Sequence, residues 1–252
     1  MVHGLENFQK YFNGLEDRYT LIGGVACYLS MKEAALPFRA TKDLDIVLCA
    51  EALDREFVQK FWDFVQEGEY EHRQKSTGDK QFFRFINPKN ESYPVMLELF
   101  SRKPDDLLLE IDNGFTPIPT DEEVSSLSAI LLDEGYYQCI QDGKEIIDGV
   151  PILKSEYIIP FKMRAWLDLT ERSSKGDGSV NSKDIKKHKN DVFRISQLLS
   201  PSLKVELTAS IKKDILRFMD KVTEKDVNFK DLKIKGLTLD QVYKTFYKIY
   251  SL

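Results

Sequence analysis

The chain has 252 residues, of which 42% are hydrophobic and 31% charged, and its formal net charge is −5. This length suits one large or two small domains with a substantial core, and the acidic balance excludes a protein that coats nucleic acid non-specifically, although local basic patches remain open. Three widely spaced cysteines fit neither a disulfide framework nor a zinc motif, and no apolar run is long enough to cross a bilayer.

The first half of the chain predicts strands alternating with helices. The cysteine pattern favours a reducing compartment and residues 1–11 lack the apolar core of a signal peptide, so we expect a cytoplasmic protein without a membrane partner. Apolar residues recur at helical spacing in some segments and form alternating or continuous apolar runs in others. We expect helices over residues 5–15, 24–32, 53–64 and 121–132, the last capped by Thr120, and strands over 20–22, 42–49, 81–86 and 93–100.

The second half predicts a hairpin and then mainly helices. Residues 136–140 and 145–147 read as two strands that turn across Asp142-Gly143. The Gly- and Ser-rich segment 172–182 reads as a mobile loop. We expect helices over 156–169, with Ser155 as the cap, and over 182–199, 211–222 and 239–250.

Two short motifs in the first fifth of the chain carry chemistry. Gly23-Gly24 follows an apolar strand and opens a helix, which lets the backbone and the positive end of the helix dipole approach a phosphate. Asp43 and Asp45 lie two residues apart on a strand, so both side chains point to one face. Converging carboxylates repel one another unless a cation lies between them, and Mg²⁺ suits such ligands. Together the motifs favour phosphoryl or nucleotidyl transfer; singly, they also fit a tight turn and a solvated strand end.

The spacing of these residues resembles one enzyme superfamily. Gly23-Gly24 followed by Arg39-x-Thr41-x-Asp43-Leu44-Asp45 is similar to the DNA polymerase β-type nucleotidyltransferases and, among them, to the abortive-infection (AbiEii-like) nucleotidyltransferase toxins. The resemblance implies an α+β fold, with a mixed β-sheet flanked by helices and a helical C-terminal region. The corresponding domains would span residues 1–153 and 154–252.

The resemblance also implies the members of the active site. Glu98, the one charge in the apolar run 95–100, would join Asp43 and Asp45 as the third metal ligand; the alternative is an edge-strand glutamate facing water. Mg²⁺ or Mn²⁺ would be the cofactor and a nucleoside triphosphate (NTP) the substrate. The remaining nucleotide contacts would come from Gly23, Gly24, Arg39, Thr41 and Lys42, although Arg39 and Lys42 also fit surface charges.

A second group of site residues is implied in the C-terminal region. Lys162 matches a helical lysine of the related toxins, and Asp191 matches the acid of their second element. The remainder of that element is Lys183-Asp184 or Lys187-His188, and the register between these stays open. The alternative for each lysine is a solvated basic helix face. We expect Lys162 and Asp191 to be catalytic, and Asp184 and Lys187 to bind the nucleotide.

The expected function is transfer of a nucleoside monophosphate from an NTP to a hydroxyl acceptor. RNA such as tRNA, a protein and a small molecule all remain open as the acceptor, and the basic segment 183–189 favours RNA. A toxin role with a cognate antitoxin follows from the resemblance alone. The rival hypotheses are a non-catalytic nucleotide-binding or interaction module that keeps the fold, and a purely structural α/β protein.

Overall fold

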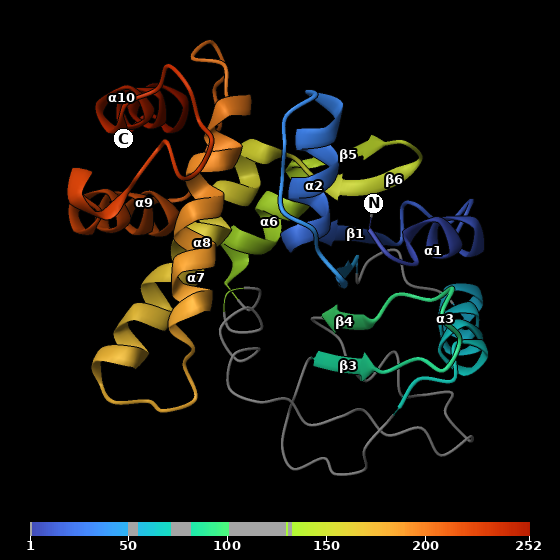
Figure 1. The fold of residues 1–252 in the computed structure, drawn as a ribbon. Coiled ribbons are helices and arrows are strands. Elements are labelled where there is room, and N and C mark those ends of the chain that lie inside the picture. The colour runs from blue at the N-terminus through green and yellow to red at the C-terminus, as the bar shows by residue number, and fades with distance from the viewer. Residues whose placement is uncertain (1, 50–54, 72–81, 101–129, 131–132) are drawn as a thin grey trace. The chain divides into compact units, whose positions relative to one another are not determined.

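The computed structural model describes residues 2–49, 55–71, 82–100, 130 and 133–252. These residues form two compact units that interleave along the chain. The first contains the described residues of 2–33, 37–100 and 144–153, and the second contains residues 34–36, 130, 133–143 and 154–252 (Figure 1). A domain division after residue 153 stays a prediction, and the expected helix over 121–132 lies almost entirely outside the described residues.

The first unit is built on a six-stranded mixed sheet with the strand order β3-β4-β2-β1-β6-β5. β2 pairs antiparallel with β1 and parallel with β4, while β1 pairs parallel with β6. The outer strands β3 and β5 pair antiparallel with β4 and β6. The strands are β1 (Tyr19–Ile22), β2 (Asp43–Leu48), β3 (Phe82–Ile86), β4 (Met96–Phe100), β5 (Lys144–Ile147) and β6 (Val150–Leu153).

An aromatic core covers one face of this sheet. It is formed by α1 (Leu5–Tyr11) and α3 (Arg55–Glu67), whose buried rings pack in edge-to-face and tilted pairs. Tyr19 of β1 joins it, with its ring centroid 5.5 Å from that of Phe8 and 6.0 Å from that of Phe12. Since side chains alternate along a strand, Leu44 and Ile46 share this face, and Asp43 and Asp45 point to the other.

Helix α2 (Gly23–Glu33) begins without a linker at the end of β1 and contacts β1, β2 and β5. Its small and apolar residues Val25, Ala26, Cys27 and Leu29 are all buried. Its first turn contains no acidic residue. The N-terminal N–H groups of a buried helix therefore lie at the end of β1, where the sheet presents its carboxylates.

The second unit is helical and is organised by the long helix α7. Its elements are α6 (Glu134–Asp142), α7 (Ser155–Ser174), α8 (Ser182–Ile195), η2 (Ser196–Leu198), α9 (Ala209–Lys221), η3 (Glu224–Asp226) and α10 (Leu239–Tyr250). Helix α7 packs against α8, with which it forms a helical hairpin, and against α9 and α6. The buried rings of Trp166, Phe193 and Phe218 form part of its core. The α+β fold class, a mixed sheet with flanking helices and a helical C-terminal region, is confirmed.

The expected hairpin over 136–147 is wrong. Residues 134–142 form α6, because the carboxylate of Asp133 accepts hydrogen bonds from the backbone N–H groups of Gly135 and Tyr136 and caps the helix. The real hairpin joins β5 to β6 through Asp148-Gly149, both at positive φ (51° and 75°). Burial of the α6 aromatic residues in the second unit overrides their strand propensity.

The other expected helices and strands that fall on described residues are confirmed with shifted ends. Helix α7 continues to Ser174, into the segment expected to be a loop, and the carboxylate of Asp177 binds the Arg172 guanidinium. Ser155 is the first residue of α7 and not its cap, a position that Lys154 occupies without a side-chain bond. Among the described residues, no helix has the length and hydrophobicity that crossing a bilayer requires.

Candidate active site

The Gly-Gly corner brings the end of β1 against the carboxylate strand β2. Gly23 has a φ of +64°, a backbone conformation that residues other than glycine rarely adopt. A Cβ at Gly23 would overlap the carboxylate of Asp45, and a Cβ at Gly24 would lie 2.6 Å from Oγ1 of Thr41. Both glycines are therefore required by close approach, and Asp45 lies directly at the N-terminus of α2.

Asp45 and Glu98 lie side by side on the open face of the sheet. They are paired in the parallel register of β2 and β4, so their side chains leave the same face. Glu98 is only 9% exposed and lies within hydrogen-bonding reach of the Asp45 carboxylate. Burial, followed by the charge and hydrogen bonding of Asp45, raises the pKa of Glu98 well above its usual value. The two acids thus meet as expected, and Glu98 is not a solvated edge residue.

Arg84 of β3 completes this cluster and was not anticipated. It lies opposite Glu98 in the antiparallel register of β3 and β4. Its guanidinium donates two hydrogen bonds to Oε1 of Glu98, of 2.9 Å from Nε and 2.6 Å from Nη2. This contact opposes the rise in the pKa of Glu98. The signal in the sequence is a single charge within the aromatic strand Phe82–Ile86, but its partner depends on strand register.

Asp43 stands apart from this pair. It begins β2 on the same face as Asp45, half exposed, and its Cα pairs with Met96. No group of three Asp, Glu, His or Cys side chains within the described part of the chain is placed to hold a metal ion. The structure thus joins two of the three expected ligands. Carboxylate oxygens beside a helix N-terminus are nevertheless the chemistry that Mg²⁺ and a phosphate require, so these residues fit the ion in kind.

The remaining expected residues of the first unit are Arg39, Thr41 and Lys42, which precede β2 in the sequence. Thr41 is buried against Gly24, which gives it a positioning role for the glycine turn. Lys42 is exposed. Arg39 is half-buried, with its guanidinium carbon 5.4 Å from the centroid of the Phe38 ring. Thr41 is thus part of the corner itself, and the two cations flank it in sequence.

The C-terminal residues form a separate group in the second unit. Nζ of Lys162 on α7 lies 3.5 Å from Oδ2 of Asp191 on α8, and both side chains are buried. Nη1 of Arg194 lies 3.4 Å from the other oxygen of Asp191. The structure thus brings the expected lysine and aspartate together. Removing either one would leave the other as an uncompensated buried charge, which is strongly destabilising.

Both candidates for the second element, Lys183-Asp184 and Lys187-His188, lie on α8. Asp184 lies in the first turn of the helix, where the positive dipole end favours a carboxylate. Lys187 and His188 follow it by three and four residues and Asp191 by seven, so all are neighbours on one side of the helix. Lys183 lies exposed beside the Asn181 cap, which accepts a hydrogen bond from its backbone N–H. This placement is compatible with Lys187-His188 and Asp191 forming one element.

Comparison with known proteins gives only distant structural matches. No protein-family model and no curated protein matches the chain. The crystal structure of an antigenic nucleotidyltransferase-like protein from Paracoccidioides brasiliensis matches with a TM-score of 0.46 and 16% identity, over 91% of this chain and 90% of that one. The solution structure of the antibiotic-resistance factor ANT(2'')-Ia matches with a TM-score of 0.38 and 10% identity, over 86% and 90%. Similarity at this level says nothing of activity, so the chemistry has to come from the residues themselves.

Proposed function

We propose that the protein is a metal-dependent nucleotidyltransferase, which transfers a nucleoside monophosphate from an NTP to a hydroxyl acceptor. The observation that carries the proposal is the position of the Asp45 carboxylate, directly over Gly23 at the N-terminus of α2 and beside the buried Glu98. A phosphate-binding turn and a convergent pair of carboxylates thus share one corner. A buried glutamate beside a second carboxylate is costly for stability, which favours a functional reason for the arrangement.

Each residue of this corner would have a distinct role in the reaction. The free N–H groups at the start of α2 would hold the phosphates of the NTP. Asp45 and Glu98, with Asp43 joining them from the same face of the sheet, would hold Mg²⁺ or Mn²⁺, which when bound would offset the charge on the attacking and leaving oxygens. The raised pKa of Glu98 suits it to accept the proton of the acceptor hydroxyl. The acceptor oxygen would bond to the α-phosphorus, the bond to the bridging oxygen would break, and pyrophosphate would leave.

The finer parts of the proposal rest on the sequence resemblance. These are the nucleotide-binding roles of Arg39, Thr41, Lys42, Asp184 and Lys187, and the catalytic roles of Lys162 and Asp191. The acceptor, whether RNA such as tRNA, a protein or a small molecule, and a toxin role with a cognate antitoxin belong here too. Growth arrest on expression, relieved by a neighbouring gene product, would test the last.

The test of the reaction is incubation with α-³²P-labelled NTPs, Mg²⁺ and a mixture of RNA, protein and small-molecule acceptors. Asp45→Asn is nearly isosteric and is expected to lower transfer by at least about 100-fold, since it removes a carboxylate from the reacting centre. Asp63→Asn, at a half-exposed position of α3 on the aromatic side of the sheet, is the control. Equal labelling by Asp45→Asn and wild type would defeat the assignment.

A non-catalytic nucleotide-binding module is the second candidate. It is favoured by the pair of adjoining carboxylates, without a third, in the described part of the site. Such a module would be stabilised against heat by NTP and Mg²⁺ but would release no pyrophosphate. Measuring both quantities on the same sample separates the two candidates.

A further inference from the structure

Charge is distributed unevenly between the two ends of the chain. Residues 154–252 contain 21 Lys and Arg against 13 Asp and Glu, a formal net charge of +8. Residues 1–153 contain 15 against 28, which gives −13. The modest total of −5 is therefore the sum of a strongly acidic N-terminal region and a strongly basic C-terminal one. Charge asymmetry of this kind points to a polyanionic partner.

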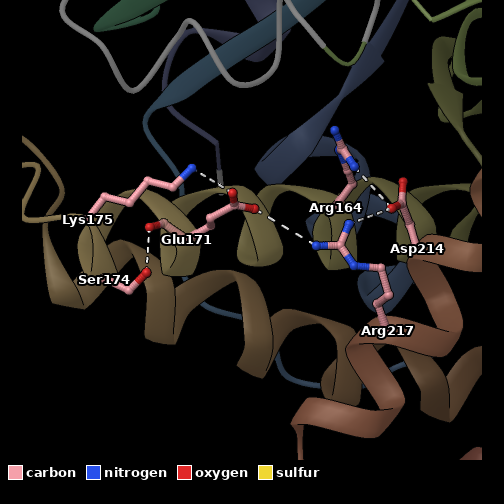
Figure 2. Close-up of polar contacts among 6 residues, drawn as sticks. All are labelled: Arg164, Glu171, Ser174, Lys175, Asp214 and Arg217. Carbon is pink, nitrogen blue, oxygen red and sulfur yellow. Dashed lines mark hydrogen bonds and ion pairs between the residues drawn. The ribbon is translucent and has the colours of Figure 1, made fainter.

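Some of the acidic groups of residues 154–252 neutralise arginines. Asp214 is buried and contacts both Arg164, at 3.0 Å, and Arg217, at 3.5 Å (Figure 2). Arg172 is bound by Asp177, and Arg194 by Asp191. All four arginines of this region are thus held by carboxylates and contribute little free positive charge.

The lysines are used differently. Lys175 and Lys244 form exposed ion pairs with Glu171 and Asp240 one helical turn away, as Figure 2 shows for the first. Apart from these two and Lys162, the lysines of residues 154–252 have no carboxylate of the described residues within 4.0 Å, and five of them, from α8 and from residues 225–230, form one surface. These five, called here the lysine ridge, are Lys183, Lys186, Lys189, Lys225 and Lys230.

The ridge is one surface because α8 and the η3 segment lie side by side. Nζ of Lys189 donates a 2.6 Å hydrogen bond to the backbone oxygen of Asp226 in η3. The rings of Phe193 and Phe229 meet at 5.7 Å in an edge-to-face contact. The carboxylate of Asp226 itself accepts hydrogen bonds from the backbone N–H and hydroxyl of Thr223. The lysines of both segments, of which all but Lys189 are exposed, therefore add to one positive field.

We propose that the lysine ridge binds the phosphate backbone of a nucleic-acid strand. Lysine is a compact point charge on a flexible stem and suits phosphates without a fixed register, whereas arginine suits planar carboxylate pairs, the use to which this unit puts all four of its arginines. Lys183, Lys186 and Lys189 lie about one turn apart on α8 and form a row along the helix, which suits the regularly spaced phosphates of a nucleic-acid strand. If the proposed transfer reaction is correct, a nucleic acid is the acceptor class that this ridge favours.

The experiment measures binding of a fluorescein-labelled 20-nucleotide RNA by anisotropy, in EDTA and without NTP, between 50 and 300 mM KCl. Wild type is compared with Lys186→Gln/Lys225→Gln, which removes two ridge charges. The matched control is Lys175→Gln/Lys244→Gln, which removes two exposed lysines that already have carboxylate partners and changes the net charge equally. DNA of the same sequence and polyglutamate are tested in parallel.

Loss of two phosphate contacts is expected to weaken RNA binding roughly ten- to thirty-fold at about 0.1 M salt and to flatten the log–log salt slope by about 1.4. The control should bind nearly as wild type. Equal weakening by both variants, salt-independent binding, or preference for polyglutamate would overturn the proposal. Equal binding of DNA would support it and widen the ligand class. Because neither metal nor NTP is present, and Asp45→Asn should bind RNA normally, failure here is distinguishable from failure of the transfer reaction.

Discussion

At the scale of single residues, the cluster of Asp45, Glu98 and Arg84 shows how much a site can be read in advance. The two acids are visible as charges in apolar strands, and their common face follows from alternation along each strand. Arg84 is equally visible, but only the register of β3 on β4 shows that it binds Glu98. Its guanidinium occupies Oε1 of a carboxylate that a metal would also attract.

The like charges at this corner predict a variant more stable than the wild type. Because the pKa of Glu98 is raised in the folded chain, the folded state binds more protons than the unfolded state, and stability falls as pH rises through the interval between the two pKa values. Asp45→Asn removes one cause of the shift. In EDTA at neutral pH we expect its melting temperature to rise by roughly 2–4 °C, the shift that about 1 kcal/mol produces in a chain of this size.

Thermal unfolding at several pH values checks this prediction. The advantage of Asp45→Asn should shrink as pH falls into the range where Glu98 is protonated in both proteins. Mg²⁺ should stabilise the wild type more than the variant. A variant less stable than wild type at neutral pH would mean that Asp45 is held by attraction to Arg84 more than it is repelled by Glu98.

At the scale of secondary-structure elements, α7 shows a compensation between sequence-distant residues. Pro160 lies inside the helix and has no N–H, so the carbonyl of Glu156 loses its helical partner. The hydroxyl of Tyr250, the last residue of α10, donates a 2.7 Å hydrogen bond to that oxygen. Burial raises the pKa of Tyr250, so the hydroxyl stays a donor. The proline and the tyrosine thus act as a pair that joins α10 to α7.

This pairing predicts a non-additive double mutant. Tyr250→Phe leaves a part-buried carbonyl without its donor and is expected to cost about 1 kcal/mol in urea unfolding. Pro160→Ala restores the helical N–H, so Tyr250→Phe in that background should cost clearly less. Equal costs in both backgrounds would show that the Tyr250 hydroxyl does not replace the missing helical bond.

Helix α6 shows where pattern alone is misleading. Its residues Tyr136, Tyr137, Cys139 and Ile140 suit a strand by composition as well as a helix, and nothing within the segment decides between them. The decision comes from the Asp133 cap and from burial, including the hydrogen bond of the Tyr136 hydroxyl to Asp214 on α9. The sequence predicts part of β5, as residues 145–147, but pairs it with the wrong segment, and it does not predict β6 as a strand.

At the scale of the whole molecule, each unit has its own aromatic core, so the two should lose structure separately. Phe218→Ala opens a cavity beside Trp166 and Phe193 and is expected to destabilise the helical unit by about 3–5 kcal/mol. Hydrogen exchange should then accelerate in α7, α8 and α9 while β1, β2 and β4 keep their protection. Phe12→Ala, in the core of the first unit, should produce the reverse pattern.

A uniform loss of protection in both units after either substitution would contradict this independence. It would show that the chain unfolds as a single cooperative body. Calorimetry on the same variants provides a second measure, since independent units give two transitions of which only one moves.

The sequence by itself determined most helices and strands, the Gly23-Gly24 turn and the common face of Asp43 and Asp45, because glycine conformation, strand alternation and helical periodicity are local properties. The fold class followed from the family resemblance. Only the tertiary structure decided that Asp45 lies over Gly23, that Glu98 is held by Arg84, and that Lys162 is paired with Asp191. These contacts join segments far apart in the chain, and their geometry depends on strand register and helix packing, which no local pattern encodes.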